Sequence, residues 1–269
     1  NDHMVNLKLD TNAIIKTNES IQQLILVGDF SQGSYDRWDS INYLIIEGGI
    51  LDCSNVNQGI FTEVPLTRIR NVHFDNITNY GLVVGRASAS SDTKVNECNF
   101  TGIGSGVDDI CTAIKVDGSD NEFNHIRIDG TKVGIDVNGG GNFFNDIHMT
   151  AVFFSNYTNY NDSIAFDISS ANNFYNLCYA DTYHIAFNIT NNSANYFTNC
   201  FTYWYYSTSE TEAICFRATG NNPNIYVANT SLSIPSTGTN SFFKLTDYLS
   251  VNNLNMNNSI KLINNIIFI

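Results

Sequence analysis

A short apolar pattern recurs along almost the whole chain, and such a repeat restricts the possible folds more than any other sequence feature. Each copy consists of an apolar residue, a second one three positions later, and a third two positions after that. The middle residues of successive copies lie about 20 to 30 positions apart. The assigned copies are Ile21/Leu24/Leu26, Ile41/Leu44/Ile46, Ile69/Val72/Phe74, Val95/Cys98/Phe100, Phe123/Ile126/Ile128, Phe144/Ile147/Met149, Phe174/Leu177/Tyr179, Phe197/Cys200/Thr202, Ile225/Ala228/Thr230 and Val251/Leu254/Met256.

Short strands separated by polar turns account for the rest of most periods. A second apolar segment follows each copy, for example at residues 81–84, 113–116 and 134–137, and turns rich in Gly, Asn and Ser close the period. These segments leave no room for crossover helices, and the best helix-forming residues are scarce. A period of this length with two or three short strands matches one coil of a parallel β-helix. We therefore predict an all-β fold, a parallel β-helix solenoid of about ten coils.

Alternate residues of such a coil point inward and stack on the equivalent residues of the next coil, which explains the aligned apolar positions. The residue before the middle apolar position is polar in most copies, and we expect its Asn members to form ladders of stacked amides at the corners. A leucine-rich repeat would need a more regular Leu pattern, and a propeller would need longer periods. The polar positions are Asn71, Glu97, His125, Asp146, Asn176, Asn199 and Asn253.

Acidic residues outnumber basic ones by 26 to 13, which gives a formal net charge of −13. Such a surface repels phosphate backbones and anionic lipids, so we expect neither a nucleic-acid nor a membrane partner. The six cysteines form no Cys-x-x-Cys pair and no His lies at metal-ligand spacing, so we expect buried free thiols, no metal and no cofactor. Residues 1–4 look like an expression-tag remnant, and residues 5–269 are expected to form a single β-helix domain.

Two segments near the N-terminus carry a family resemblance. Residues 45–53, Ile-Ile-Glu-Gly-Gly-Ile-Leu-Asp-Cys, and residues 7–16 resemble the early coil, and the segment before it, of the right-handed β-helix, pectate-lyase-like superfamily. With its Asn-rich, acidic and aromatic-rich composition, the chain looks most like a tail spike or tail appendage of a bacteriophage. That resemblance implies right-handed coils and a homotrimer on the virion tail, in contact with other phage tail proteins, that binds and often cleaves a bacterial surface polysaccharide. A secreted protein is the alternative location.

A second, local resemblance concerns a pair of aspartates. Residues 107–116, Val-Asp-Asp-Ile-Cys-Thr-Ala-Ile-Lys-Val, are similar to the Gly-Asp-Asp-Cys-Ile-Ala-Ile-Lys motif of polygalacturonase-like glycoside hydrolases. This resemblance implies catalytic roles for Asp108 and Asp109. The chain departs from the family by one extra residue within the motif, by Tyr80 where the preceding coil should supply Asp, and by Val133 where the following coil should supply His. A solvated acidic loop is the alternative interpretation.

Three further acidic residues are candidates for catalysis. Asp136 and Asp167 occupy equivalent outward positions on successive coils, which lie about 4.8 Å apart in a β-helix. Lys115 stands one coil earlier and Asn188 one coil later. Glycoside hydrolases need two carboxyl groups, close together for retaining chemistry and farther apart for inverting chemistry. Glu210 is the third candidate, beside an aromatic insertion, and a salt-bridged sheet face is the alternative interpretation of the Asp136 column.

Two long insertions are rich in aromatic residues and are expected to lie on the same side of the solenoid. Aromatic rings with polar tips stack on sugar faces, so these residues are candidates for substrate binding, and packing at a subunit interface is the alternative. The insertions span residues 151–162 and 202–212, and the candidate residues are Tyr157, Tyr160, Tyr203, Trp204, Tyr205 and Tyr206.

The combined features favour a protein that binds a bacterial surface polysaccharide, either a capsule or a wall glycan or teichoic acid, and hydrolyses it as a glycoside hydrolase. Two alternatives stay open. A glycan-binding adhesin would use the same aromatic surface without cleaving the glycan. A polysaccharide lyase would need basic residues or bound Ca²⁺ to stabilise a uronate carbanion, and the chain has only 13 Lys and Arg residues.

Overall fold

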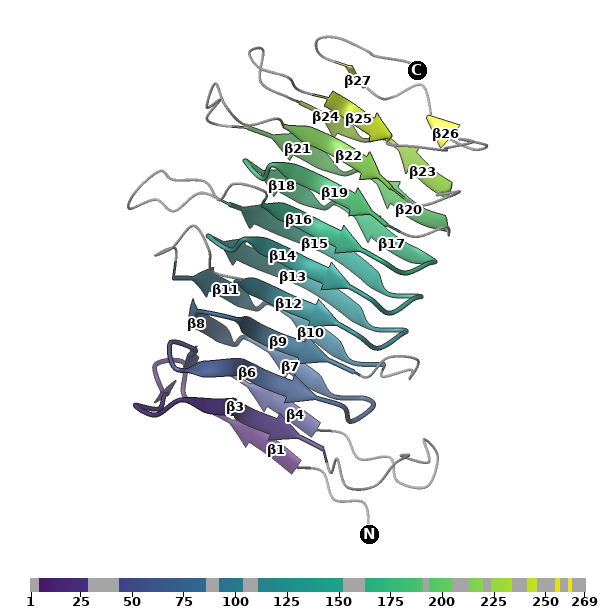
Figure 1. Ribbon diagram of the computed structural model, residues 1–269. Helices are drawn as coiled ribbons and strands as arrows, with labels where there is room; N and C mark the ends of the chain where they lie inside the picture. Colours follow the sequence, from purple (N-terminus) through teal and green to yellow (C-terminus); the bar gives the residue numbers. More distant parts are fainter. Residues whose placement is uncertain are drawn as a thin grey trace.

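The computed structural model consists of short parallel strands and contains no helix within the described residues. The strands stack in sheets around one long core, an arrangement compatible with a β-helix-like solenoid (Figure 1). The predicted all-β fold with parallel strands is therefore confirmed. No helix of this part of the chain is long and apolar enough to cross a membrane. The described residues are 5–28, 44–85, 92–103, 111–151, 163–190, 194–204, 213–219, 224–233, 241–245, 255–256 and 261–262.

Three ladders of hydrogen-bonded parallel strands form the walls of the solenoid, and we number them in the order in which the chain enters them. Successive strands of the first ladder come from successive sequence repeats, and they pair in register. Its strands are β1 (Val5–Lys8), β4 (Leu44–Glu47), β7 (Arg68–Arg70), β10 (Lys94–Asn96), β13 (Glu122–Asp129), β15 (Phe143–Thr150), β17 (Asn173–Asn176), β20 (Ala194–Thr198), β23 (Asn224–Ala228) and β26 (Asn255–Met256).

The second ladder shares the long strands β13 and β15 with the first, because these two strands continue around the corner between the ladders. The remaining strands begin after a bend. They are β2 (Ile14–Ile15), β5 (Ile50–Asp52), β8 (His73–Ile77), β11 (Asn99–Gly102), β18 (Tyr179–Asp181), β21 (Phe201–Tyr203), β24 (Ser231–Leu232) and β27 (Lys261–Leu262).

The third ladder closes each period with the second apolar segment of the repeat. Its strands also pair in parallel register. They are β3 (Ile21–Val27), β6 (Val56–Thr62), β9 (Tyr80–Val84), β12 (Thr112–Val116), β14 (Val133–Val137), β16 (Ile164–Ile168), β19 (Ile185–Ile189), β22 (Ile214–Ala218) and β25 (Ser241–Leu245).

Columns of buried aromatic rings run through the core because in-register pairing places equivalent residues about 4.8 Å apart. Rings of neighbouring strands stack nearly parallel, and rings of different columns meet edge to face. One column contains Phe123, Phe144, Tyr175 and Phe197, with centroid distances of 5.0, 5.0 and 4.7 Å, and the other contains Phe166, Phe187 and Phe216, with distances of 5.3 and 4.8 Å.

Tyr175 is the one member of these columns with a hydroxyl group, and it is fully buried. Its Oη has no hydrogen-bond partner within the part of the chain that the structure describes. A buried unpaired hydroxyl is destabilising, so Tyr175→Phe should raise the free energy of unfolding by about 1 kcal/mol. The matched control is Tyr183→Phe, because the equally buried Tyr183 hydroxyl lies 3.1 Å from Thr131 Oγ1. That control should destabilise, and thermal unfolding of both variants measures the sign. A loss of stability in Tyr175→Phe would contradict the interpretation.

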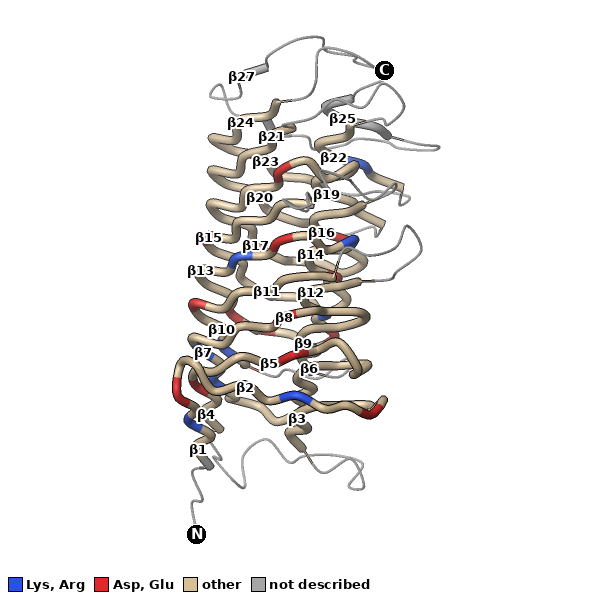
Figure 2. Tube along the Cα trace, turned by 90° about the vertical axis from the view of Figure 1, so that its left-hand side faces the viewer, with Lys and Arg blue, Asp and Glu red and all other residues tan. Residues whose placement is uncertain are grey.

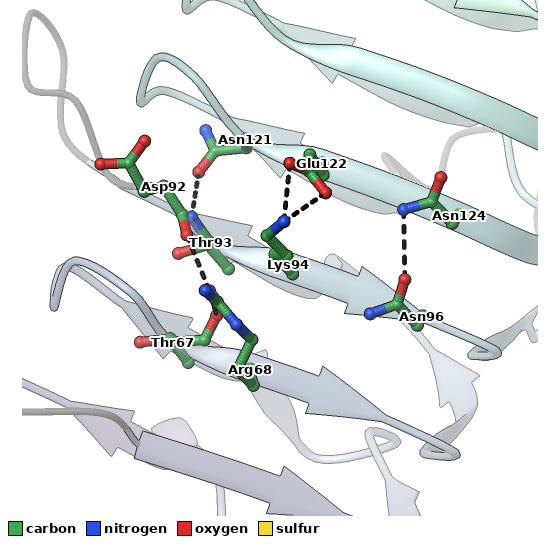
Figure 3. Close-up of polar contacts among 9 residues, drawn as sticks. All are labelled: Thr67, Arg68, Asp92, Thr93, Lys94, Asn96, Asn121, Glu122 and Asn124. Carbon is green, nitrogen blue, oxygen red and sulfur yellow. Dashed lines mark hydrogen bonds and ion pairs between the residues drawn. The ribbon is translucent and has the colours of Figure 1, made fainter.

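A ladder of buried side-chain amides runs along the corner before the first ladder. Asn121 donates from its backbone N–H and from Nδ2 to Asn142 Oδ1, each at 2.9 Å. Asn142 repeats both bonds to Asn173 Oδ1 at 3.0 and 3.1 Å, and the backbone N–H of Asn173 continues to Asn195 Oδ1 at 3.2 Å. Figure 3 shows the start of this ladder, where Thr93 N–H donates to Asn121 Oδ1 at 2.9 Å. The Asn side chains at this corner accept hydrogen bonds from backbone N–H groups that have no partner in a strand ladder.

The predicted corner position has a different role. Its residues adopt left-handed backbone angles, with φ of 56° at Asn71 and 54° at Glu97, His125 and Asn199. Asn and Asp tolerate this conformation better than other side chains, which explains the polar bias of the position. Outward amide contacts do occur near this corner, including Asn124 Nδ2 to Asn96 Oδ1 at 3.1 Å (Figure 3). The fully buried amide ladder, however, lies at another corner.

Several assigned copies of the repeat are wrong in register. In the 174–180 region Leu177, not Asn176, has the left-handed angle and is exposed, while Tyr175 is buried. The strand therefore begins its inward pattern one residue later than assigned, and two other copies are displaced by two and by five residues. The inward triplets are Tyr175/Cys178/Ala180, Val227/Thr230/Leu232 and Ile46/Gly49/Leu51. They replace, in the same order, the assigned copies Phe174/Leu177/Tyr179, Ile225/Ala228/Thr230 and Ile41/Leu44/Ile46. The residues of a fourth assigned copy, Ile21, Leu24 and Leu26, belong to the third ladder.

The expected buried free thiols are confirmed. All six cysteines are unpaired and buried. Burial raises the pKa of the Cys53, Cys98 and Cys215 thiols to about 12, which keeps them protonated and unreactive at neutral pH. Cys178 follows the same pattern, with its pKa raised by burial and by the neighbouring thiol of Cys200.

Candidate active site

The predicted Asp136 column lies on the outer face of the third ladder. Asp136 on β14 pairs in register with Asp167 on β16, and their neighbours in the column are Lys115 on one side and Asn188 on the other. Arg217 on β22 follows Asn188. The two carboxylates therefore stand on adjacent strands, as the spacing of the sequence repeat predicts.

Most polar groups of this column bind one another. Asn188 Nδ2 donates to Asp167 Oδ1 at 2.7 Å, and Arg217 Nε donates to Asn188 Oδ1 at 2.7 Å. Lys115 forms an ion pair with Asp117 at 3.1 Å. These contacts hold Asp167 in a structural network, so the column has the features of the salt-bridged sheet face given above as the alternative interpretation.

Asp136 is the member of this column with a perturbed carboxyl group. Burial raises its pKa above the ordinary value of 3.8, helped by the charges of Asp167 and Asp117, and this outweighs a hydrogen bond from Asn138 and the charge of Lys115. The folded protein thus binds this proton more tightly than the unfolded chain. The free energy of unfolding should therefore fall as the pH rises from 3.8 through the raised pKa, and the loss persists at neutral pH.

We expect Asp136→Asn to remove this loss in the free energy of unfolding. At pH 7 the variant should be more stable by up to about 1 kcal/mol, because the side chain is partly exposed and solvent screens part of the effect. At a pH below 3.8 the difference should disappear. Urea unfolding at pH 7 and at a pH below 3.8 measures the difference in the free energy of unfolding between the variant and the original protein. An equal difference at both pH values would show that the carboxylate charge is not responsible.

A second group of titratable and aromatic side chains lies on the outer face of the second ladder. One outward column contains Arg127, His148, Tyr179 and Phe201 on β13, β15, β18 and β21, and the next contains Asp129, Thr150, Asp181 and Tyr203 on the same strands. The residues between them, including Ile128 and Met149, are buried in the core. Figure 2 views the solenoid from the side on which β5, β8 and β11 of this ladder are seen. We call the eight residues of the two columns the second-ladder face.

Aromatic rings cover one end of the second-ladder face. The rings of His148 and Tyr179 are tilted with centroids 4.4 Å apart, and Tyr179 and Phe201 follow at 5.0 Å. Tyr203 stands beside Phe201 with ring centroids 6.3 Å apart, and both side chains are exposed. Exposed rings with a polar tip are suited to stacking on the apolar faces of sugars.

Asp181 lies directly beside these rings. The hydroxyl of Tyr179 donates to Asp181 Oδ2 at 3.3 Å, and Thr182 Oγ1 donates to Oδ1. Burial raises the pKa of Asp181 above 3.8 although these two hydrogen bonds and the nearby His148 oppose the shift. A carboxyl group with a raised pKa is suited to donate a proton.

Asp129 lies beside a cation. The Arg127 guanidinium donates from Nε to Asp129 Oδ2 at 2.9 Å and from Nη2 to Oδ1 at 3.4 Å. The pKa of His148, between the two aspartates, is lowered by burial and by the charge of Arg127, against the nearby carboxylates of Asp129, Asp181 and Asp146. At neutral pH this imidazole is uncharged.

The separation of Asp129 and Asp181 follows from the ladder. Thr150 lies between them in register, so two strand steps separate their backbones by roughly 9.6 Å. Inverting glycoside hydrolases hold their acid and base roughly 6.5–9.5 Å apart to admit a water molecule. The backbone separation of the two aspartates therefore lies near the upper end of that range.

The structure places the other predicted residues as follows. Tyr203 belongs to the second-ladder face. Trp204 packs partly against the core, and its indole N–H donates to the Tyr183 carbonyl at 2.7 Å. The remaining predicted site residues lie outside the described residues. They are Asp108, Asp109, Tyr157, Tyr160, Tyr205, Tyr206 and Glu210.

Asp129, Asp181 and His148 are absent from the sequence-based candidates. The misassigned copy Phe174/Leu177/Tyr179 placed Tyr179 inside the core, whereas the buried residue is Ala180. A one-residue correction turns both neighbours of Ala180 outward. The signal that could have revealed the correct inward position is the small residue Ala180, which lies in register with Met149.

Among the described residues, no group of three or more His, Cys, Asp or Glu side chains is placed to hold a metal ion. No protein-family model, curated protein or solved structure matches this chain.

Proposed function

We propose that this protein binds a bacterial surface polysaccharide on the second-ladder face and hydrolyses it there. The observation that supports this proposal best is the combination of exposed rings with two carboxyl groups in different surroundings. Asp181 has a raised pKa and contacts Tyr179, while Asp129 stands two strands away beside Arg127. Two carboxyl groups in different environments are the usual equipment of glycoside hydrolases.

The roles follow from the two environments. Asp181, protonated, would donate its proton to the oxygen of the leaving sugar, and Asp129 would take a proton from a water molecule that attacks the anomeric carbon. The sugar would rest on Tyr179, Phe201 and Tyr203. The neutral imidazole of His148 lies on the strand between those of the two carboxylates and can hold hydroxyl groups or water by hydrogen bonds.

The proposal includes the finer assignment of the fold. The chain would form right-handed coils, about ten in number, of the pectate-lyase-like type. Its resemblance to phage tail spikes and tail appendages then supports a homotrimer on the virion tail that contacts other tail proteins and meets the polysaccharide of the host surface. The fully parallel ladders and the aromatic, acidic outer face support this assignment.

A non-catalytic adhesin is the second candidate function, and one observation favours it. Arg127 donates hydrogen bonds from two nitrogens to the two carboxylate oxygens of Asp129, so an attacking water molecule would have to compete with Arg127 for them. The same rings would then bind the glycan without cleaving it.

Incubation with purified bacterial capsule and wall polysaccharides distinguishes these functions. Hydrolysis should release new reducing ends without absorbance from an unsaturated uronate, and such absorbance would instead identify a lyase. Binding without any new ends would favour the adhesin. Failure to bind any of the polysaccharides would contradict the proposed function.

A further inference from the structure

A row of aromatic rings runs along the outer face of the first ladder, on a different wall of the solenoid from the second-ladder face. Phe143 on β15, Phe174 on β17, Tyr196 on β20 and Tyr226 on β23 pair in register, one ring on each successive strand (Figure 1). Successive ring centroids are 4.8 Å apart, and the ring planes differ by 7°, 8° and 11°. Phe143 and Phe174 are 50% and 37% exposed. We call these four residues the aromatic strip.

The rings of the aromatic strip are offset from one another. Carbon atoms of stacked groups make contact at about 3.5–4.0 Å, whereas the ring centroids lie 4.8 Å apart. Each ring is therefore displaced sideways and leaves part of a face uncovered by the next ring. An extended β-1,4-linked sugar chain advances by nearly one strand spacing per sugar, so a chain that lies along the solenoid axis contacts successive rings.

Side-chain amides accompany the aromatic strip in the next outward column. Asn145 and Asn176 each lie two residues after a ring of the strip, so rings and amides share the outer face. Asn176 Nδ2 donates to Asn145 Oδ1 at 2.7 Å, and Asn176 Oδ1 accepts a bond from Asn199 Nδ2 at 3.0 Å. A primary amide has two N–H donors and two acceptor sites on its oxygen, so these bonds leave donors and acceptors for sugar hydroxyl groups.

The ring column and the amide column together form an uncharged surface in an acidic protein. The amide column continues over β20 and β23 with a threonine and an alanine, and the chain as a whole has a net charge of −13. Ion pairs border this surface, between Glu122 and Lys94 at 2.7 Å on the preceding strands and between His125 and Asp146 at 3.5 Å at the corner. A surface without charge matches a neutral ligand better than an ionic one.

The size of this surface argues against a second copy of the chain as its occupant. Four strands in length and two outward side chains in width, it covers roughly 250 Å². A stable interface between two proteins covers about 800 Å² on each partner. Rings with adjacent hydrogen-bonding groups on a narrow, extended surface are instead suited to a sugar chain.

We propose that the aromatic strip is a second glycan-binding site, which holds a neutral, extended polysaccharide lengthwise along the solenoid. The rings contact the apolar faces of the sugars, and the amides of Asn145 and Asn176 bind their hydroxyl groups. The ring and amide columns contain no carboxyl group, so this site binds without cleaving. It is separate from the reacting pair of the proposed function.

Calorimetry of the full chain with hexasaccharides tests the proposal. The neutral probes are the β-1,4-linked hexamers of glucose and of N-acetylglucosamine, and an oligogalacturonate is the charged comparison. We expect a neutral hexamer to bind with an affinity that added salt leaves unchanged. Phe174→Leu should weaken this binding about fivefold, because leucine keeps an apolar side chain but lacks the ring. Phe174→Tyr keeps the ring and should retain the binding.

Phe201→Leu is the matched control, because Phe201 is an exposed ring of the second-ladder face. Binding that is lost in Phe201→Leu and kept in Phe174→Leu would overturn the second site and leave the proposed function standing. Tighter binding of the oligogalacturonate, or no binding of either neutral hexamer, would also overturn the second site. Light scattering of Phe174→Asp tests the other occupant, since a lower mass than that of the original protein would show that a second copy covers the strip.

Discussion

Replacing Asp181 by Asn should lower the turnover of the bound polysaccharide by about 10²- to 10⁴-fold while the fold stays intact. The amide keeps the size of the carboxyl group. Its oxygen can accept one of the two hydrogen bonds from Tyr179 and Thr182, and its NH2 group can donate to the other hydroxyl, but it cannot donate a proton to the leaving oxygen. Initial rates of reducing-end release measure the loss, and circular dichroism with the unfolding midpoint checks the fold. Asp129→Asn should cause a loss of similar size, because the base is then missing.

Asp136→Asn is the matched control for this experiment. Asp136 is also a partly buried aspartate with a raised pKa, but it lies on the third ladder. We expect this variant to retain turnover. The reverse result, with activity lost in Asp136→Asn and kept in Asp181→Asn, would move the active site to the Asp136 and Asp167 column that the sequence repeat predicts.

The pH dependence of turnover gives an independent test of the acid. Asp181 is active as an acid only when protonated, so the rate should fall as the pH rises through its raised pKa, which lies above 3.8. We therefore expect the rate to decline towards high pH, and Asp181→Asn should lose that decline.

The fold could be predicted from the sequence because its main determinant is periodic. Strand pairing in a parallel solenoid repeats the same register on each coil, so apolar triplets such as Ile69/Val72/Phe74 and Val95/Cys98/Phe100 align directly, and all six residues are buried. Assignment of the register from the sequence fails where aromatic residues lie on both faces of a strand. In β17 the exposed Phe174 and the buried Tyr175 are neighbours, and hydrophobicity alone cannot distinguish them.

Prediction of the candidate site from the sequence depended on the same strand register. The outward alignment of Asp136 with Asp167 was predictable because residues 134–137 and 165–168 have similar patterns with one acidic position each. Asp181 was hidden because its strand was assigned one residue off, which exchanges the inner and outer faces. The spacing of Asp129 and Asp181 depends on β15 lying between them, and no local motif encodes it.

The buried amide ladder is where a single substitution should cost most stability. Asn142 is fully buried, and its side chain accepts two hydrogen bonds from Asn121 and donates two, to Asn173 Oδ1 and to the Gly139 carbonyl. Asn142→Ala would remove these four buried hydrogen bonds in a site closed to water, although the Gly139 carbonyl keeps a bond from Ser170 Oγ at 2.6 Å. Each buried hydrogen bond contributes about 0.5–1.5 kcal/mol, so we expect a loss of about 2–6 kcal/mol in the free energy of unfolding.

Asn145→Ala is the matched control, because it removes the same side chain from the same stretch of chain three residues later. Asn145 faces outward, and its Oδ1 accepts one bond, from Asn176 Nδ2 at 2.7 Å. Water can replace that partner, so the variant should lose less than about 1 kcal/mol. Urea unfolding of both variants measures the difference. Similar losses would show that outward amide contacts stabilise the stack as much as the buried ladder does. A large loss confined to Asn142→Ala would show that the stack is stabilised at the buried corner, where side-chain amides pair the backbone groups that the three ladders leave unpaired.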